Sequence, residues 1–170
     1  MILLREILKI NFRKQVNFES LSDSFSGVSI DSRKAVKTEI FFAIKGEAND
    51  GHAFVDSVIA KKVKLIVVND SWYRKNKDKF KSQAFLVVSD TIKALGELAR
   101  IHRDMMNIPV LVIAGSNGKT TTKDIVAGVL SKKFSLHKTE GNLNNHIGLP
   151  LSLLGIKENH DFCLLEAGSN

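Results

Sequence analysis

One short segment constrains the fold of this chain more than any other. The apolar run Val110-Leu-Val-Ile-Ala114 leads directly into Gly115-Ser-Asn-Gly-Lys-Thr-Thr121, and a helical pattern then extends from about Lys119 to Lys132. A continuous apolar run is typical of a strand that is buried on both faces of a parallel sheet. Strands that alternate with helices build α/β layers. We therefore expect an α/β fold in which residues 110–114 form a buried strand.

The glycines of this turn also indicate a phosphate-binding loop. They let backbone N–H groups and the helix N-terminus face phosphate oxygens, while a lysine reaches the outer phosphates and the next hydroxyl ligates Mg²⁺. Lys119 and Thr120 stand in those two positions. The usual pattern has a glycine at the position of Ile113, so this loop is two residues shorter. The alternative is an ordinary strand-to-helix turn that carries a lysine by chance.

The rest of the pattern predicts two building plans, because residues 1–88 contain three glycines and residues 89–170 contain eight. We expect strands at 28–30, 40–44, 64–68, 84–88 and 162–166, a short segment at 134–138, and helices at 1–10, 53–62, 74–81, 91–106 and 147–154. Asp90 is the expected N-cap of the helix at 91–106. A boundary near Ser89 separates a first α/β domain, 1–88, from a second domain, 89–170.

Composition and charge exclude several classes of protein. No apolar run approaches the roughly 18 residues that a membrane-spanning helix needs, and a single cysteine, Cys163, cannot form a disulfide framework, which favours the cytoplasm. The net charge is +7, with 16 basic and 10 acidic residues in 1–88 against 9 and 8 in 89–170. The basic stretch Arg74–Lys81 lacks the aromatic pattern of RNA-binding modules, so a solvated helix face is favoured over nucleic-acid binding.

Two polar segments of the first domain follow predicted strands. They are Ser29-Ile-Asp-Ser-Arg33 and Lys45-Gly-Glu-Ala-Asn-Asp-Gly-His52. Arginine offers a planar fork of donors to phosphate, and Gly46 and Gly51 permit close backbone approach to a ligand. The alternatives are a local ion pair between Asp31 and Arg33 and a simple Asn-Asp-Gly turn.

Two further candidates lie in the second domain. Glu166 ends the last predicted strand, and ligands of open parallel sheets collect at the carboxyl ends of strands, so this carboxylate can hold a nucleotide's Mg²⁺. The alternative is a surface glutamate that merely ends a strand. The segment Thr139–Pro150 is rich in asparagine, which suits either ligand contacts or the cap of the following helix.

Taken together, these segments resemble the N-terminal part of the Mur ligases, the ATP-dependent amide-forming enzymes that build the peptidoglycan peptide. Phe41-Phe-Ala-Ile-Lys-Gly46 and Asp50-Gly-His-Ala-Phe54 are similar to the family's UDP-sugar-binding domain, and the short loop Gly115–Thr121 is similar to its phosphate loop. The segment Gly141–Leu154 and Glu166-Ala-Gly-Ser-Asn170 are similar to the branch that adds D-alanyl-D-alanine to UDP-N-acetylmuramoyl-tripeptide.

The resemblance implies a role for each matching position. For the cofactor ATP it implies Gly115, Ser116, Asn117, Gly118, Lys119, Thr120 and Thr121; for Mg²⁺, Thr120 and Glu166; for catalysis, Lys119, Asn142 and Asn145. For the UDP substrate it implies Ser29, Asp31, Ser32, Arg33, Lys45, Gly46, Asp50, Gly51, His52 and Thr139. The implied fold is a small N-terminal α/β UDP-substrate domain followed by the start of a parallel-sheet P-loop ATPase domain.

The resemblance also implies a reaction and its partners. ATP activates the tripeptide carboxylate to an acyl phosphate, which the amine of D-alanyl-D-alanine attacks with release of phosphate. We expect no nucleic-acid or membrane partner, a monomer when full length, and further catalytic parts beyond Asn170, so that residues 1–170 do not ligate alone. The alternatives are the sister ligase that adds the third peptide residue, a nucleotide-binding module without catalysis, and a small P-loop kinase.

Overall fold

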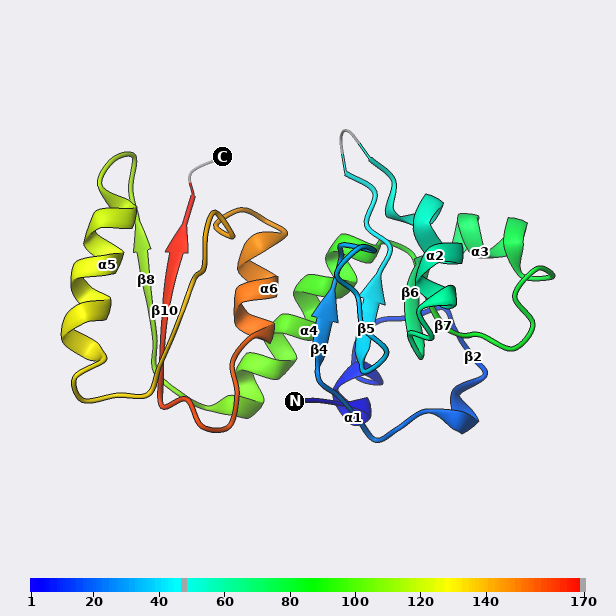
Figure 1. The fold of residues 1–170 in the computed structure, drawn as a ribbon, viewed down its shortest axis with the longest axis horizontal. Helices are drawn as coiled ribbons and strands as arrows, with labels where there is room; N and C mark the ends of the chain where they lie inside the picture. The colour runs from blue at the N-terminus through cyan, green and yellow to red at the C-terminus, as the bar shows by residue number, and fades with distance from the viewer. Residues whose placement is uncertain (47–48, 169–170) are drawn as a thin grey trace. The chain divides into compact units, whose positions relative to one another are not determined.

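The computed structural model describes residues 1–46 and 49–168, and the chain forms two compact units, Met1–Glu97 and Leu98–Asn170. Each unit combines parallel strands with helices, which confirms the predicted α/β fold class (Figure 1). The contacts divide the chain inside helix α4 (Thr91–Met106), whereas the sequence pattern places the boundary near Ser89. The Asp90 carboxylate accepts hydrogen bonds from the N–H groups of Ile92 and Lys93, so the predicted N-cap of α4 is confirmed.

Unit 1 holds a five-stranded sheet in the order β2-β7-β6-β5-β4. Four strands run parallel: β4 (Gly27–Ser29), β5 (Glu39–Phe42), β6 (Leu65–Asn69) and β7 (Ala84–Val88). They follow the predicted strands closely. Strand β2 (Lys14–Val16) pairs antiparallel with β7, and its short polar sequence carries no strand pattern from which it could have been predicted.

The core of unit 1 lies against one face of this sheet. Phe41, Ile66 and Phe85 stand side by side in register on β5, β6 and β7 and are fully buried. Helices α2 (Val55–Ala60) and α3 (Asp70–Asn76) pack on them through apolar residues such as Val58 and Tyr73. The alternate residues of the central strands are also buried, as expected for parallel strands with both faces covered. The loops at the carboxyl ends of the strands are thereby held on a rigid base.

Two predicted helices of unit 1 have other bounds than the sequence suggests: the helix predicted at 1–10 is reduced to one turn, and only residues 74–76 of the helix predicted at 74–81 lie in a helix, α3. Residues Ile2–Leu3 form strand β1, paired antiparallel with β3 (Ser24–Phe25), and helix α1 spans only Leu4–Ile7. A short strand followed by one helical turn buries both Ile2 and Ile7, so apolar residues that suggested a longer helix are buried without one. Helix α3 ends at Asn76, so the charged residues that follow it form an exposed turn. Two short 3₁₀ turns, η1 (Phe18–Ser20) and η2 (Gly51–Phe54), complete the unit.

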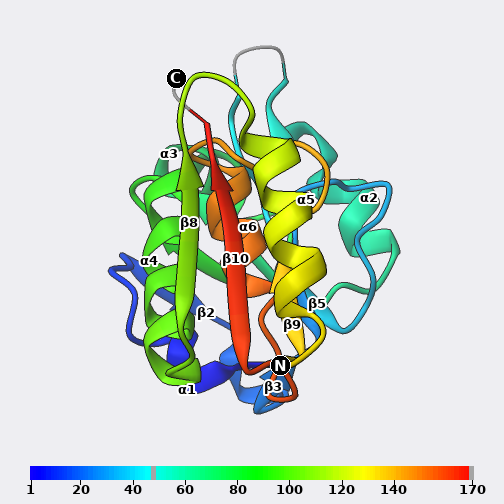
Figure 2. The same ribbon diagram turned by 90° about the vertical axis from the view of Figure 1, so that its left-hand side faces the viewer.

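Unit 2 holds a three-stranded parallel sheet in the order β8-β10-β9. Its strands are β8 (Val110–Ala114), β9 (Leu136–Lys138) and β10 (Phe162–Ala167), and β8 and β10 run side by side in the same direction (Figure 2). Helix α5 (Lys119–Leu130) lies on one side of the sheet and α6 (Gly148–Leu154) on the other (Figure 1). All of these elements match predicted ones.

Strand β8 is not buried on both faces, so that prediction is wrong for the described residues. Leu111 and Val112 are 41% and 50% exposed. The physical reason is position, because within residues 1–46 and 49–168 β8 is an edge strand whose one neighbour is β10. The central strand β10 is the buried one, and its Cys163 is fully enclosed, which raises the pKa of the thiol to about 12. None of the helices in residues 1–46 and 49–168 has the length and apolar character that crossing a bilayer requires.

Candidate functional site

The loop Gly115–Thr121 connects the carboxyl end of β8 to the start of α5. Gly118, the residue before the helix, has a φ of +75°, a conformation that side-chain-bearing residues rarely adopt, so glycine is needed there. The Lys119 ammonium folds back and donates to the carbonyl oxygens of Gly115 at 2.7 Å and Ser116 at 3.3 Å. Residues Ser116, Asn117, Thr120 and Thr121 are exposed. The loop is thus accessible to a ligand, and its own lysine side chain is folded back onto the loop backbone.

Glu166 lies next to this loop because of the sheet register. In the β8–β10 pairing, Glu166 stands opposite Ile113, two residues before the loop begins. Its carboxylate is buried, and its Oε2 atom accepts a hydrogen bond from the Thr120 hydroxyl at 3.0 Å. The Oε1 atom accepts from the Asn144 side-chain amide at 3.1 Å. The predicted meeting of Glu166 with the loop at one edge of the sheet is therefore observed.

Lys123 is a member of this site that the sequence reasoning missed. Its ammonium lies 3.2 Å from Oε2 of Glu166, and both side chains are almost fully buried. Burial raises the pKa of Glu166, but the hydrogen bonds from Asn144, Lys123 and Thr120 and the ammonium charge outweigh it. The net pKa of Glu166 is below its ordinary value, so the carboxylate is charged at neutral pH.

The oxygen donors here suit a divalent cation that binds together with phosphates. Mg²⁺ requires octahedral oxygen ligands at about 2.1 Å, which places neighbouring ligands about 3 Å apart, and it typically takes one or two carboxylates plus substrate phosphates. Thr120 Oγ1 and Glu166 Oε2 are 3.0 Å apart. Residues 1–46 and 49–168 contain no group of three or more His, Cys, Asp or Glu side chains that could hold a metal unaided. The site therefore fits Mg²⁺ held jointly with a nucleotide.

The asparagine-rich segment Thr139–Pro150 supports this site through hydrogen bonds within the protein. The Oδ1 atom of Asn145 accepts from the N–H groups of Ile147 and Gly148, so Asn145 caps the start of α6. Thr139 is buried, and its hydroxyl oxygen accepts from the backbone N–H of Glu166 at 3.0 Å. The capping role left open by the sequence is thus observed for Asn145, whereas Asn142 is exposed.

Unit 1 has a cavity of about 860 Å³ at the carboxyl ends of β4 and β5. It is lined by Ile30, Asp31, Ser32, Arg33, Ile44, Asn49, Gly51, Phe54, Ser57 and Lys61. Four of the ten predicted substrate residues therefore line it: Asp31, Ser32, Arg33 and Gly51. The sequence reasoning missed Phe54, a large apolar side chain that is 45% exposed at the cavity, and Lys61.

Asp31 and Arg33 form the local ion pair that the sequence left open as an alternative. Nε and Nη2 of Arg33 donate to the two carboxylate oxygens of Asp31 at 2.9 and 2.8 Å. Through these hydrogen bonds Arg33 holds the pKa of the Asp31 carboxyl well below its usual range. Arginine carries five N–H donors, so three make no hydrogen bond to residues 1–46 and 49–168 and can face a ligand. The Ser29 hydroxyl donates to the carbonyl of Asp31 and supports the same turn.

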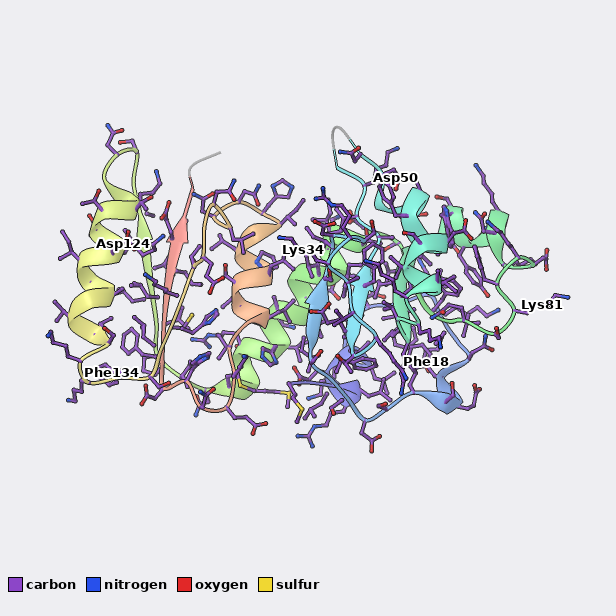
Figure 3. The ribbon with its side chains drawn as sticks, viewed as in Figure 1. Phe18, Lys34, Asp50, Lys81, Asp124 and Phe134 are labelled. Carbon is purple, nitrogen blue, oxygen red and sulfur yellow. The ribbon has the colours of Figure 1, made fainter. Side chains whose placement is uncertain are left out.

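The second predicted segment of unit 1 contributes mainly support. Asp50 stands at the start of the turn that leads to α2 (Figure 3), and its Oδ1 atom accepts from the N–H and Nδ1 of His52 at 3.0 and 2.6 Å. His52 is buried, and its Nε2 accepts from the N–H of Asn69. The described lining of the cavity does not include five of the predicted substrate residues, Ser29, Lys45, Gly46, Asp50 and His52. His52 ties the turn to β6 instead of facing a ligand.

Comparison with known families explains why these sites occur together. Residues 24–103 match the profile described as "Mur ligase family, catalytic domain", and residues 113–170 match the profile described as "Mur ligase middle domain". The chain belongs to the Mur ligase family. The second match begins at Ile113 and so includes the phosphate loop, Lys123 and Glu166. The shortened loop is thus a feature of a Mur ligase middle domain.

Two curated proteins that are similar to the chain carry the name UDP-N-acetylmuramoyl-tripeptide--D-alanyl-D-alanine ligase. The Bacillus subtilis protein is 40% identical over 142 residues, 84% of this chain and 30% of its own length. The Escherichia coli protein is 35% identical over 147 residues, 86% of this chain and 31% of its own length. The chain therefore spans about a third of the length of the curated Mur ligases it matches.

Solved Mur ligase structures have the same fold. A structure of MurF from Acinetobacter baumannii aligns with a TM-score of 0.84 at 30% identity, over 99% of this chain and 35% of that one. A MurF ligase from Thermotoga maritima in complex with ADP aligns with a TM-score of 0.68 at 30% identity, over 84% of this chain and 32% of that one.

Proposed function

We propose that the protein is an ATP-dependent ligase that joins D-alanyl-D-alanine to UDP-N-acetylmuramoyl-tripeptide during the synthesis of peptidoglycan precursors. Because the chain spans about a third of its relatives' length, this reaction is assigned to the protein as a whole. Within it, residues 1–88 act as the UDP-substrate domain, and residues 89–170 begin the ATP-binding domain. The protein works in the cytoplasm. It acts as a monomer, and light scattering after size-exclusion chromatography tests this oligomeric state.

The observation that carries this proposal is the arrangement of three groups at the start of α5. Thr120 and Glu166 present oxygen atoms 3.0 Å apart, directly beside the loop whose lysine, Lys119, is the neighbouring residue of Thr120. The loop N–H groups and the Lys119 ammonium hold the ATP phosphates, since Lys119 can exchange its two carbonyl contacts for phosphate oxygens. ADP in the Thermotoga maritima relative supports a nucleotide in this family.

Thr120 and Glu166 would hold Mg²⁺ through the hydroxyl and carboxylate oxygens described above. When bound, Mg²⁺ neutralises negative charge on the phosphates during phosphoryl transfer. Asn144 and Thr139 keep Glu166 in place through its carboxylate and its backbone N–H. We assign Thr139 and Asn145 to positioning and the exposed Asn142 to contact with the substrate near the transferred phosphate.

On the substrate side, the cavity of unit 1 takes the UDP moiety. Arg33 turns its three remaining N–H donors toward the diphosphate, while Asp31 fixes the orientation of the guanidinium. Lys61 donates to the carbonyl oxygens of Ser32 and Arg33 at 2.8 and 2.6 Å, which holds the turn that carries both residues. Phe54 offers an apolar surface at the same cavity.

Sequence similarity favours the D-alanyl-D-alanine branch over its sister. Eight curated relatives with this name are 32% to 40% identical to the chain. A structure of UDP-N-acetylmuramoyl-L-alanyl-D-glutamate--2,6-diaminopimelate ligase aligns at 18% identity with a TM-score of 0.56, which shows the common fold alone.

Calorimetric titration tests the substrate assignment. We expect UDP-N-acetylmuramoyl-tripeptide to bind more tightly than the corresponding dipeptide. Arg33→Ala should weaken tripeptide binding about 10-fold through loss of a charge-assisted contact, and ATP binding should not change. Lys119→Met should have the converse effect, with ATP affinity reduced about 100-fold. Tighter binding of the dipeptide than of the tripeptide would point to the sister reaction, which adds the third peptide residue. A folded protein that binds neither peptide would contradict the proposal.

A further inference from the structure

The nucleotide site contains a second lysine, Lys123, that the proposed function does not use. It lies one helical turn after Lys119 and three residues after Thr120, on the side of α5 that faces β10. Lysine side chains are almost never fully buried unless they are paired. The side chain of Lys123 is only 5% exposed, and its partner is Glu166. Lys119, in contrast, donates to two backbone carbonyls of its own loop.

The Lys123 ammonium and the proposed divalent cation would bind the same oxygen atom of Glu166. Oε2 of Glu166 receives the Thr120 hydroxyl at 3.0 Å and the Lys123 ammonium at 3.2 Å, whereas Oε1 receives the amide of Asn144. The proposed divalent ion would bind at Oε2, since that is the oxygen that lies beside Thr120. Two positive groups on one buried oxygen repel each other strongly, because the site is shielded from water. The ammonium therefore weakens the affinity of Glu166 for any added cation.

We propose that Lys123 is a built-in counterion that competes with the divalent ion for Glu166. This inference rests on the proposed role of Glu166 in metal binding. In the absence of ligand, Lys123 compensates the buried carboxylate and keeps it oriented. It also makes the site a poor one for free metal, because a cation that arrives alone meets the ammonium charge. Negative charge from ATP phosphates offsets that repulsion, so the metal binds with the nucleotide and not before it.

The competition is tested by measuring Mn²⁺ binding without nucleotide, by electron paramagnetic resonance of the free ion. Lys123→Met removes the charge and keeps most of the side-chain volume, so we expect its Mn²⁺ affinity to exceed that of the wild type at least 10-fold. Lys123→Arg keeps the charge and should resemble the wild type. The double variant Lys123→Met/Glu166→Gln removes both charges and should lose Mn²⁺ binding. Unchanged or weaker Mn²⁺ binding by Lys123→Met would overturn the inference.

A second measurement separates competition from direct contact with phosphate. If Lys123 acts only through Glu166, Lys123→Met binds ATP in the presence of EDTA within about 2-fold of the wild type. A loss as large as that of Lys119→Met would assign Lys123 to the phosphates and would overturn the counterion role. The double variant reports on the proposed function itself. If it binds Mn²⁺ with ATP as well as the wild type does, Glu166 is not a metal ligand, whatever Lys123→Met shows.

Folding gives a readout even if Lys123→Met is unstable without metal. The uncompensated carboxylate of Glu166 should then make the circular dichroism of the variant depend on Mn²⁺, and millimolar Mn²⁺ should restore it. Lys123→Met/Glu166→Gln should fold without any cation, because it buries no charge at this place. A Lys123→Met protein that stays unfolded at every Mn²⁺ concentration, beside a folded double variant, would also overturn the inference.

Discussion

Both units contain an ion pair at their candidate site, and the two pairs differ in burial. In unit 1, the side chains of Arg33 and Asp31 are 86% and 28% exposed. In unit 2, those of Lys123 and Glu166 are 5% and 4% exposed. Water screens an exposed pair, so Arg33 can give up part of it to a ligand at small cost. A buried pair cannot be separated without a replacement charge. Arg33 in unit 1 can therefore bind a ligand beside its solvated pair, whereas the buried pair of unit 2 opens only for a ligand that brings its own charges.

The largest expected effect breaks the buried pair and leaves the exposed one as its control. Glu166→Gln buries the Lys123 ammonium without its carboxylate, and we expect unit 2 to lose about 3 kcal/mol of stability. Asp31→Asn should leave the stability of unit 1 unchanged, because its partner Arg33 is solvated.

The chain offers a separate probe for each outcome. Its one tryptophan and one tyrosine, Trp72 and Tyr73, both lie in unit 1, so fluorescence during urea unfolding reports on that unit. Far-ultraviolet circular dichroism reports on both units. Glu166→Gln should shift the dichroism transition without shifting the fluorescence transition. Equal losses in the two variants would show that burial does not distinguish the two pairs.

Much of the site in unit 2 could be predicted from local sequence. The loop, the strand before it and the helix after it are adjacent in the chain, and Glu166 ends a recognisable strand. Lys123 could not be predicted, because a lysine within a helix ordinarily faces solvent. Its burial depends on β10, whose residue Glu166 is 43 residues away from Lys123 in the sequence. The strand order β8-β10-β9, which places β8 at the edge of the described sheet, likewise depends on distant residues and cannot be read from the apolar sequence of β8.

The first unit shows the opposite limit of sequence reasoning. The sequence singles out the turn at Asp31–Arg33, yet its pattern does not choose between an ion pair and ligand contacts. The structure shows the ion pair, together with three guanidinium donors that make no hydrogen bond to the described residues. Phe54 and Lys61 join the cavity only because α2 follows the turn at Gly51. His52 resembled a ligand-binding residue by its neighbours, but Asn69 and Asp50 occupy both of its ring nitrogens.

A second prediction sharpens the comparison by testing unit 1 through its backbone instead of its charges. A Cβ atom at Gly51 would lie 2.8 Å from the backbone nitrogen and 2.9 Å from the oxygen of Ile44. Backbone atoms cannot move aside easily, so we expect Gly51→Ala to destabilise unit 1 by about 2 kcal/mol. The matched control is Gly46→Ala, whose nearest contact would be an ordinary 3.6 Å. The urea midpoint from Trp72 fluorescence measures both, and equal midpoints would refute the close approach.

A third prediction concerns the neutral polar contacts of unit 2. Asn145 caps α6 through two backbone N–H groups, and loss of such a cap typically costs about 1 kcal/mol. Asn145→Ala should therefore lower the dichroism midpoint, whereas Asn142→Ala, at an exposed position, should not. In ligation assays of the full-length protein, Asn142→Ala should show the larger loss of rate relative to its loss of stability. A destabilised Asn142→Ala protein of normal activity would reverse the two assignments.

The smallest expected effect is a pH dependence in unit 2. Burial lowers the pKa of His137 below its ordinary value of 6.5, and His137 and Lys157 add to the effect of burial in lowering the pKa of His160. The unfolded chain therefore binds protons at a higher pH than the folded one, so stability is present above pH 6.5 and decreases as pH falls below it. Between pH 7.5 and 5.5 we expect the Tm of the wild type to fall by about 2 °C.

His137→Gln identifies the source of that decrease. His137 Nε2 contacts the carbonyl oxygen of Ser152 at 2.6 Å, and a glutamine amide can donate to the same oxygen without titrating. The variant should therefore lose less Tm than the wild type over the same pH range, with His160 accounting for the remainder. An unchanged pH dependence in His137→Gln would place the effect elsewhere. Both histidines are half-buried and lie in unit 2. The result therefore also shows whether half-buried groups change the stability of the protein, as we expect for the buried ion pair of unit 2, or leave it unchanged, as we expect for the solvated pair of unit 1.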